Sequence, residues 1–159
     1  MGALSRVPRE LLAMMRSGVS VIVGSRSAAM RPSLMRAVCS HIEPDGEQVT
    51  VFLSRAQSAQ LLDDIRATGQ VAVVFSEPST HHTVQLKASR ASVRPAAPAD
   101  QPWIDAYRAA MEREIERVGF APHFTRAMLA CRLDELVAVS FSPELAYDQT
   151  PGPRAGASL

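Results

Sequence analysis

Short apolar runs separated by turn residues dominate the first half of the chain. β-branched residues gather in residues 20–25 and 48–54, and apolar residues are interspersed with polar ones in residues 31–42, so each run favours a β-strand. The turn sequence Pro44-Asp45-Gly46 joins the second run to the third. We therefore predict three strands, of which the last two form an antiparallel hairpin.

The spacing of apolar residues becomes helical further along the chain. Leu61, Leu62 and Ile65 mark one side of a helix over residues 57–68, which Gly69 ends. Steps of three and four residues predict further helices over residues 8–17, 103–118 and 123–130.

Three more runs read as strands. Residues 71–75 are nearly all apolar, which is typical of a central strand, and residues 136–141 form a last strand. Residues 83–93 alternate between apolar and polar and predict one long strand, bulged near Ser89. Strands joined by hairpins, with single helices between them, predict an α+β fold, mainly β, and not a doubly wound parallel sheet.

The length and composition of the chain fit one domain and restrict the classes of partner that it could bind. We assign residues 1–145 to a single domain and residues 146–159 to a tail rich in Pro and Gly. A net charge of +1 provides no electrostatic attraction to nucleic acid or to an anionic membrane. No run of about 20 apolar residues predicts a membrane span, and the charged N-terminus does not resemble a signal peptide. We expect a cytoplasmic protein.

The cysteines and histidines do not predict a metal site. Cys39 and Cys131 lie in apolar stretches and form no C-x-x-C pair, so we expect two reduced thiols in the core. His81 and His82 are adjacent, and adjacent side chains on a strand point to opposite faces. We therefore predict no metal.

Several segments resemble the pyridoxamine 5′-phosphate oxidase-like family, the FMN-binding split barrels. Arg31-Pro32-Ser33-Leu34-Met35-Arg36-Ala37-Val38 is similar to the second strand of that family, and residues 51–61 are similar to its third strand and following helix. Residues 71–75 and 83–88 resemble its next two strands, and residues 149–156 resemble a tail seen in some relatives. The resemblance is closest over residues 8–95. It implies a six-stranded antiparallel split β-barrel with flanking helices, a homodimer, and FMN at the dimer interface.

The resemblance also implies which residues contact the flavin. The matching positions are Arg36, Ala37 and Val38 on the second strand, Leu53 and Ser54 on the third, Ser58 at the next helix, and Thr83 or Gln85 on the fifth strand. Ala59 and Gln60 stand where the oxidases have a basic pair, which weakens the phosphate site. We expect Arg55 to supply part of the missing charge.

FMN requires a cationic phosphate socket, donors near its pyrimidine edge and an apolar wall for its ring. Arg36, Arg55 and Ser58 could form the socket, while Thr83, Gln85 and Lys87 could face the pyrimidine edge. The sequence thus predicts an FMN-dependent oxidoreductase that acts on a small molecule. It identifies no catalytic residue, because the flavin carries the hydride step.

Structural roles compete with these assignments. Arg36 could be a surface residue on an edge strand, Ser54 and Ser58 could be helix N-caps, and Gln85 and Lys87 could form the solvated side of a strand. A module without turnover that binds a flavin, a deazaflavin or haem is the alternative function. In its haem version, the candidate iron ligands are His41, His81, His82 and His123.

Overall fold

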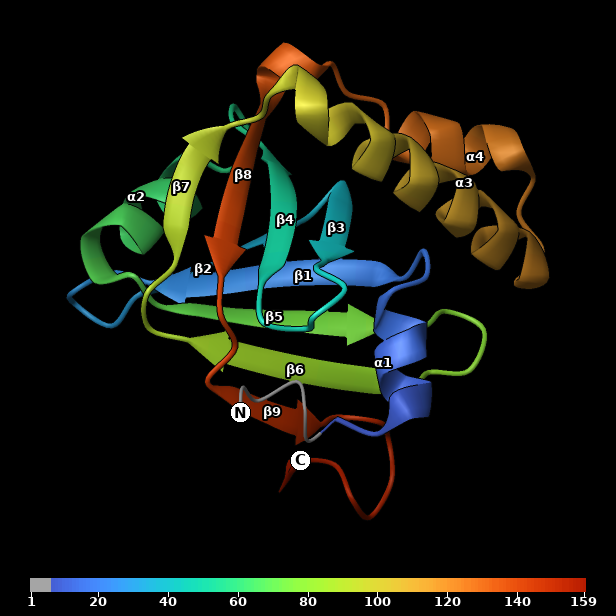
Figure 1. Ribbon diagram of the computed structural model, residues 1–159, viewed down its shortest axis with the longest axis horizontal. Helices are drawn as coiled ribbons and strands as arrows, with labels where there is room; N and C mark the ends of the chain where they lie inside the picture. The colour runs from blue at the N-terminus through green and yellow to red at the C-terminus, as the bar shows by residue number, and fades with distance from the viewer. Residues whose placement is uncertain (1–6) are drawn as a thin grey trace.

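Two antiparallel sheets form the centre of the computed structural model, which describes residues 7–159 (Figure 1). One sheet has the strand order β10-β9-β6-β5-β1-β2 and the other β3-β4-β8-β7. The strands are β1 (Ser20–Arg26), β2 (Pro32–Arg36), β3 (Cys39–Ile42), β4 (Val49–Ser54), β5 (Val71–Ser76), β6 (Thr83–Ala88), β7 (Ser92–Pro95), β8 (Leu136–Phe141), β9 (Leu145–Asp148) and β10 (Ala157–Ser158). The predicted antiparallel α+β architecture is confirmed, but its strands are divided between a six-stranded and a four-stranded sheet.

Four α-helices flank the sheets within residues 7–159 (Figure 1). Helices α3 and α4 lie side by side, and α2 packs against β1, β2 and β7. The predicted helices are confirmed with ends shifted by one or two residues. They are α1 (Arg9–Met15), α2 (Ala59–Thr68), α3 (Gln101–Arg117) and α4 (Pro122–Met128). None of the helices described is long and apolar enough to cross a membrane.

The expected single strand over residues 31–42 is wrong, because the chain changes sheets within it. The Ala37 amide still donates to the Val21 carbonyl of β1, whereas the Val38 amide donates to the Phe52 carbonyl of β4. Pairing therefore passes from one sheet to the other between two neighbouring residues. The chain bends at Val38, but the alternation of apolar and polar residues in the sequence does not reveal the switch.

A second switch divides the expected long strand over residues 83–93. Strand β6 pairs with β5 and β9, while β7 pairs with β8 in the other sheet. The switch falls where we expected a bulge. The Ser89 amide bonds the Glu144 carboxylate, and the Ala91 amide bonds the Gly69 carbonyl.

The six-stranded sheet has one buried and one half-exposed face. Inward residues of β1, β5 and β6 are fully buried, and they include Val21, Val23, Val73, Phe75, Val84 and Leu86. Their outward neighbours, such as Ile22, Val74 and Gln85, are only partly covered by the described chain. Burial on one face explains the period of two in these strands, and it leaves the other face available.

The C-terminal residues continue the six-stranded sheet. Strand β9 pairs with β6, and β10 pairs with β9. The boundary that we predicted between a domain ending at residue 145 and a C-terminal tail thus falls within β9. Two-residue pairing such as that of β10 has no detectable period, so the sequence pattern could not indicate it.

Candidate functional site

The outward face of the six-stranded sheet carries four of the predicted flavin contacts. Arg36 lies at the end of β2, and Thr83, Gln85 and Lys87 alternate along β6. Their neighbours in sequence on β6, Val84 and Leu86, point inward and are fully buried. The four polar residues therefore share one side of the sheet.

Arg36 and Gln85 belong to one row across the sheet. Arg36 is the partner of Ile22, Ile22 is the partner of Val74, and Val74 is the partner of Gln85. Three strand spacings of about 4.8 Å place the two polar residues roughly 14 Å apart at their Cα atoms. An apolar floor made by Ile22 and Val74 lies between a guanidinium and a carboxamide.

The next row has small residues at its centre and a hollow above them. Leu34, Gly24, Ala72, Lys87 and Leu145 are successive partners across five strands. All five line a cavity of about 460 Å³. A Cβ at Gly24 would meet the flexible side chain of Leu34 at 2.9 Å, so the floor is flat because this residue has no side chain. A planar aromatic ring fits such a surface.

The sheet switch brings a second group of predicted contacts together. The Val38 amide bonds Phe52, and Cys39 is the register partner of Phe52, so Ala37 and Val38 run alongside Leu53. Ala37 and Leu53 are buried. These two can therefore offer a ligand backbone groups or an apolar contact, but no charged group.

The predicted cationic socket is not preassembled. Arg36 donates to the Ser20 hydroxyl at 2.8 Å and is exposed on an edge strand. The Arg55 amide donates to the Glu135 carbonyl at 2.9 Å, and its side chain is exposed. Among residues 7–159, no hydrogen bond or ion pair between side chains links Arg36, Arg55 and Ser58.

Ser58 occupies the N-cap position of α2, but its side chain makes no capping hydrogen bond. The alternative in which its hydroxyl caps the helix is therefore wrong. The residue is only 1% exposed, and its Oγ has no partner in the described chain. A buried hydroxyl without a partner costs about 1–3 kcal/mol. It is therefore a polar atom available for a ligand at the start of this helix.

The positions after Ser58 are poorly suited to a doubly charged phosphate. Gln60 donates to the Asp64 carboxylate at 3.0 Å, and Ser33 donates to the same carboxylate at 2.6 Å. Asp64 is a buried acid one turn into α2. Ala59 adds no charge, so Arg36, Arg55 and Ser58 are the matched donors that remain for the phosphate. The residues present thus fit the ring of a flavin on the sheet. They fit the flavin phosphate only in part.

Two of the three outward polar residues of β6 already have close contacts within the protein. The Thr83 amide donates to the Thr150 hydroxyl, and its own hydroxyl bonds Ser76. The Lys87 ammonium lies 5.1 Å from the centre of the Tyr147 ring. Thr83 is thus held by the protein itself, whereas Gln85 has one long contact, 3.4 Å from Gln149.

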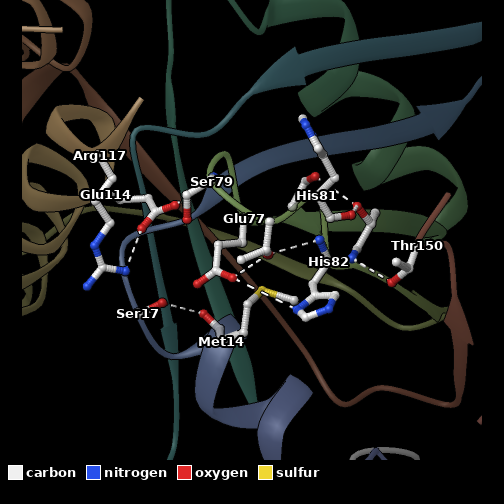
Figure 2. Close-up of polar contacts among 12 residues, drawn as sticks. Met14, Ser17, Glu77, Ser79, His81, His82, Glu114, Arg117 and Thr150 are labelled. Atoms are coloured by element: carbon white, nitrogen blue, oxygen red, sulfur yellow. Dashed lines mark hydrogen bonds and ion pairs between the residues drawn. The ribbon is translucent and has the colours of Figure 1, made fainter. Parts of the chain in front are cut away.

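A polar network that the sequence did not predict braces the β5–β6 loop (Figure 2). The Glu77 carboxylate accepts a hydrogen bond from Thr80 and lies 4.0 Å from His82 Nδ1. Buried Glu114 of α3 accepts from the Ser79 amide at 2.8 Å and from Arg117 at 3.2 Å. A cavity of about 350 Å³ adjoins these residues. They come from separate elements, so no local motif could have revealed them.

The histidines are not arranged to hold a metal. No group of three or more His, Cys, Asp or Glu side chains suited to a metal occurs within residues 7–159. The His41 ring stacks on Trp103, with ring centroids 3.9 Å apart and planes 5° from parallel. His81 and His82 belong to the loop at the end of β5, and His123 belongs to α4.

Comparison with known proteins shows a shared fold. No family model matches the sequence, and no curated protein matches it either. A candidate pyridoxamine 5′-phosphate oxidase from Lactobacillus delbrueckii has a TM-score of 0.56 at 12% identity, over 89% of this chain and 93% of that one. An F420 reductase has a TM-score of 0.56 at 12% identity, over 88% and 98%. HutZ, a heme storage protein from Vibrio cholerae, has a TM-score of 0.52 at 16% identity, over 90% and 94%.

At these identities the similarity describes the fold, while the three proteins differ in the ligands that their names indicate. The structural similarity covers nearly the full length of each of the three proteins. The fold of the chain is therefore similar to that of pyridoxamine 5′-phosphate oxidase-like proteins, as the resemblance of its sequence predicted.

Proposed function

We propose that the chain binds FMN on the outward face of its six-stranded sheet and uses it to oxidise or reduce a small molecule. The observation that carries this proposal is the row from Arg36 through Ile22 and Val74 to Gln85. Its apolar centre suits the flavin ring, and its ends suit the polar edges. A bound flavin would supply the hydride-transfer chemistry.

The chain's own residues would bind and orient the cofactor. The Gln85 carboxamide can donate to the pyrimidine carbonyls, and the Lys87 ammonium adds positive charge beside it. Arg36 and the unpartnered hydroxyl of Ser58 are the donors best placed by their surroundings for the phosphate. Backbone amides at the start of α2 add to that anion site.

A homodimer is part of this proposal. Leu34 and Leu145 are 67% and 46% exposed on the same outward face. Covering these side chains with a second copy of the chain would remove apolar surface from water. It would also enclose a flavin between the six-stranded sheets of the two subunits. Sedimentation of the purified protein as a single subunit would contradict the dimer.

The similarity to HutZ makes haem the second ligand to test, and the similarity to an F420 reductase adds a deazaflavin. The outward residues of β1, β2, β5, β6 and β9 include no histidine. A histidine ligand to iron would therefore have to come from outside this sheet face, which favours a flavin over haem held by histidine.

The test is an absorption and fluorescence titration of the purified protein with FMN. Binding quenches flavin fluorescence. Arg36→Gln and Gln85→Leu should each weaken the affinity for FMN about tenfold, as expected when a hydrogen bond to a charged or buried group is lost. Arg66→Gln is the control, since Arg66 is exposed at the far end of α2 and pairs with Asp63. Unquenched FMN, or a Soret band or F420 binding in its place, would overturn the FMN assignment.

A further inference from the structure

Helices α3 and α4 lie side by side (Figure 1), and residues of both line a small cavity away from the outward face of the six-stranded sheet. Its volume is about 240 Å³. The residues that line it are Arg108, Glu112, Thr125, Arg126, Ala130 and Cys131. At about 30 Å³ for each water, it is large enough for a small ligand and several waters.

Two of the residues that line this cavity each carry a buried polar atom without a hydrogen-bond partner. The atoms are Arg108 Nε and Thr125 Oγ1, and Thr125 is only 1% exposed. Only three such side-chain atoms occur within residues 7–159, so two of the three belong to residues of one cavity. Buried polar groups are rarely left unpaired. A ligand that accepts hydrogen bonds from both would satisfy them together.

The charge of Arg108 is not neutralised by an acid. Its Nη2 donates to the Leu129 and Cys131 carbonyls at 3.1 Å each and lies 2.7 Å from Cys131 Sγ. None of the ion pairs among the described residues includes Arg108. The other two charges of the cavity cancel, because Arg126 pairs with Glu112 through two contacts of 2.9 and 3.2 Å. The cavity therefore carries one uncompensated positive charge.

We propose that this cavity binds a small oxyanion, such as phosphate, sulfate or a carboxylate. Arg108 Nε and the Thr125 hydroxyl are the donors, and the Cys131 thiol forms part of the wall. Guanidinium groups bind such anions strongly because their donors are planar and charged. A neutral ligand would form hydrogen bonds with the two unpartnered atoms but would leave the charge of Arg108 uncompensated, which favours an anion.

The Cys131 thiol reports directly on occupancy. We would alkylate the full-length protein with neutral iodoacetamide, with phosphate, sulfate or acetate added, against chloride at equal ionic strength. Because protection scales as one plus the ratio of ligand concentration to Kd, an anion at about ten times its Kd should slow alkylation about tenfold. Cys39 is fully buried, so peptide mass mapping of both cysteines separates protection from unfolding.

Two variants locate the effect, and a third controls for charge. Thr125→Val removes an unpaired hydroxyl, so it should keep or raise the Tm without anion and abolish the protection. Arg108→Lys keeps the charge but loses the Nε donor, and it should also weaken protection. Arg113→Gln removes a positive charge from α3 outside this cavity and should leave protection unchanged. Lack of protection by all three anions, or an equal loss in Arg113→Gln, would overturn the proposal.

Discussion

Gly18 packs directly against the backbone of Met111 in α3. A Cβ added at Gly18 would lie 2.0 Å from the Met111 amide nitrogen and 2.3 Å from the carbonyl carbon of Ala110. Backbone atoms cannot move aside as a side chain can. The connection from α1 to β1 therefore depends on glycine for its close approach to α3.

Gly18→Ala should accordingly destabilise the protein by about 1–3 kcal/mol or more, since it overpacks a backbone contact. Urea unfolding followed by circular dichroism measures this change. Gly24→Ala is the matched control, because its Cβ would meet only the movable Leu34 side chain. Equal stability of Gly18→Ala and the unmodified protein would contradict the close packing.

A second contact joins α3 to the same connection. The Tyr107 hydroxyl donates to the Val19 carbonyl at 2.5 Å, and both residues are buried. Burial raises the pKa of Tyr107 above its usual range, so the hydroxyl stays a donor at all ordinary pH values. Tyr107→Phe leaves the carbonyl unpaired and should cost about 1–3 kcal/mol. We expect Tyr147→Phe, at the sheet surface, to cost much less in the same unfolding experiment.

The Asp100–Arg94 pair makes part of the stability depend on pH. Two contacts of 2.7 and 2.8 Å join the side chains, and the Ala97 amide also donates to the carboxylate at 2.8 Å. The hydrogen bond from Arg94 lowers the pKa of Asp100 below its usual value. A lowered folded pKa stabilises the fold above the unfolded pKa of about 3.9, and this contribution is lost as the pH falls through the folded pKa.

Asp100→Asn should therefore be less stable than the unmodified protein at neutral pH, and the gap should shrink below about pH 4. Urea midpoints measured across this range give the comparison. Asp63→Asn serves as the control, because Asp63 is exposed and pairs only with its neighbour Arg66. A gap that stays constant with pH would show that the carboxylate charge is not responsible.

Substitution of Ser58 can distinguish a role in ligand binding from a role in the stability of the fold. Because its buried hydroxyl has no partner in the described chain, Ser58→Ala should leave the stability of the ligand-free protein unchanged or slightly higher. If the hydroxyl holds the flavin phosphate, the same change should weaken FMN binding about tenfold. Ser142→Ala, at an exposed position, is the control in both measurements. Loss of stability without loss of affinity would place the role of Ser58 in the fold.

Local patterns determined most of the elements but not their assignment to sheets. Strands such as β5 and helices such as α2 bury one side, and burial of one side leaves a period that the sequence displays. The switches at Ala37 and Ser89 leave no such trace, because each is a short bend between two strand segments whose hydrogen-bond partners differ. Only the positions of the neighbouring strands decide which sheet each half joins.

For the candidate sites too, the sequence determined one part and the tertiary structure another. The sequence by itself determined an antiparallel α+β chain with residues resembling a flavin-binding family, including Arg36, Ser58 and Gln85. The tertiary structure alone decided that Arg36 and Gln85 lie in one cross-strand row, that Ser58 is buried without a partner in the described chain, and that Arg108 and Thr125 line one cavity. The physical reason is that a site depends on distances between residues far apart in the chain, and a local pattern of burial carries no information about those distances.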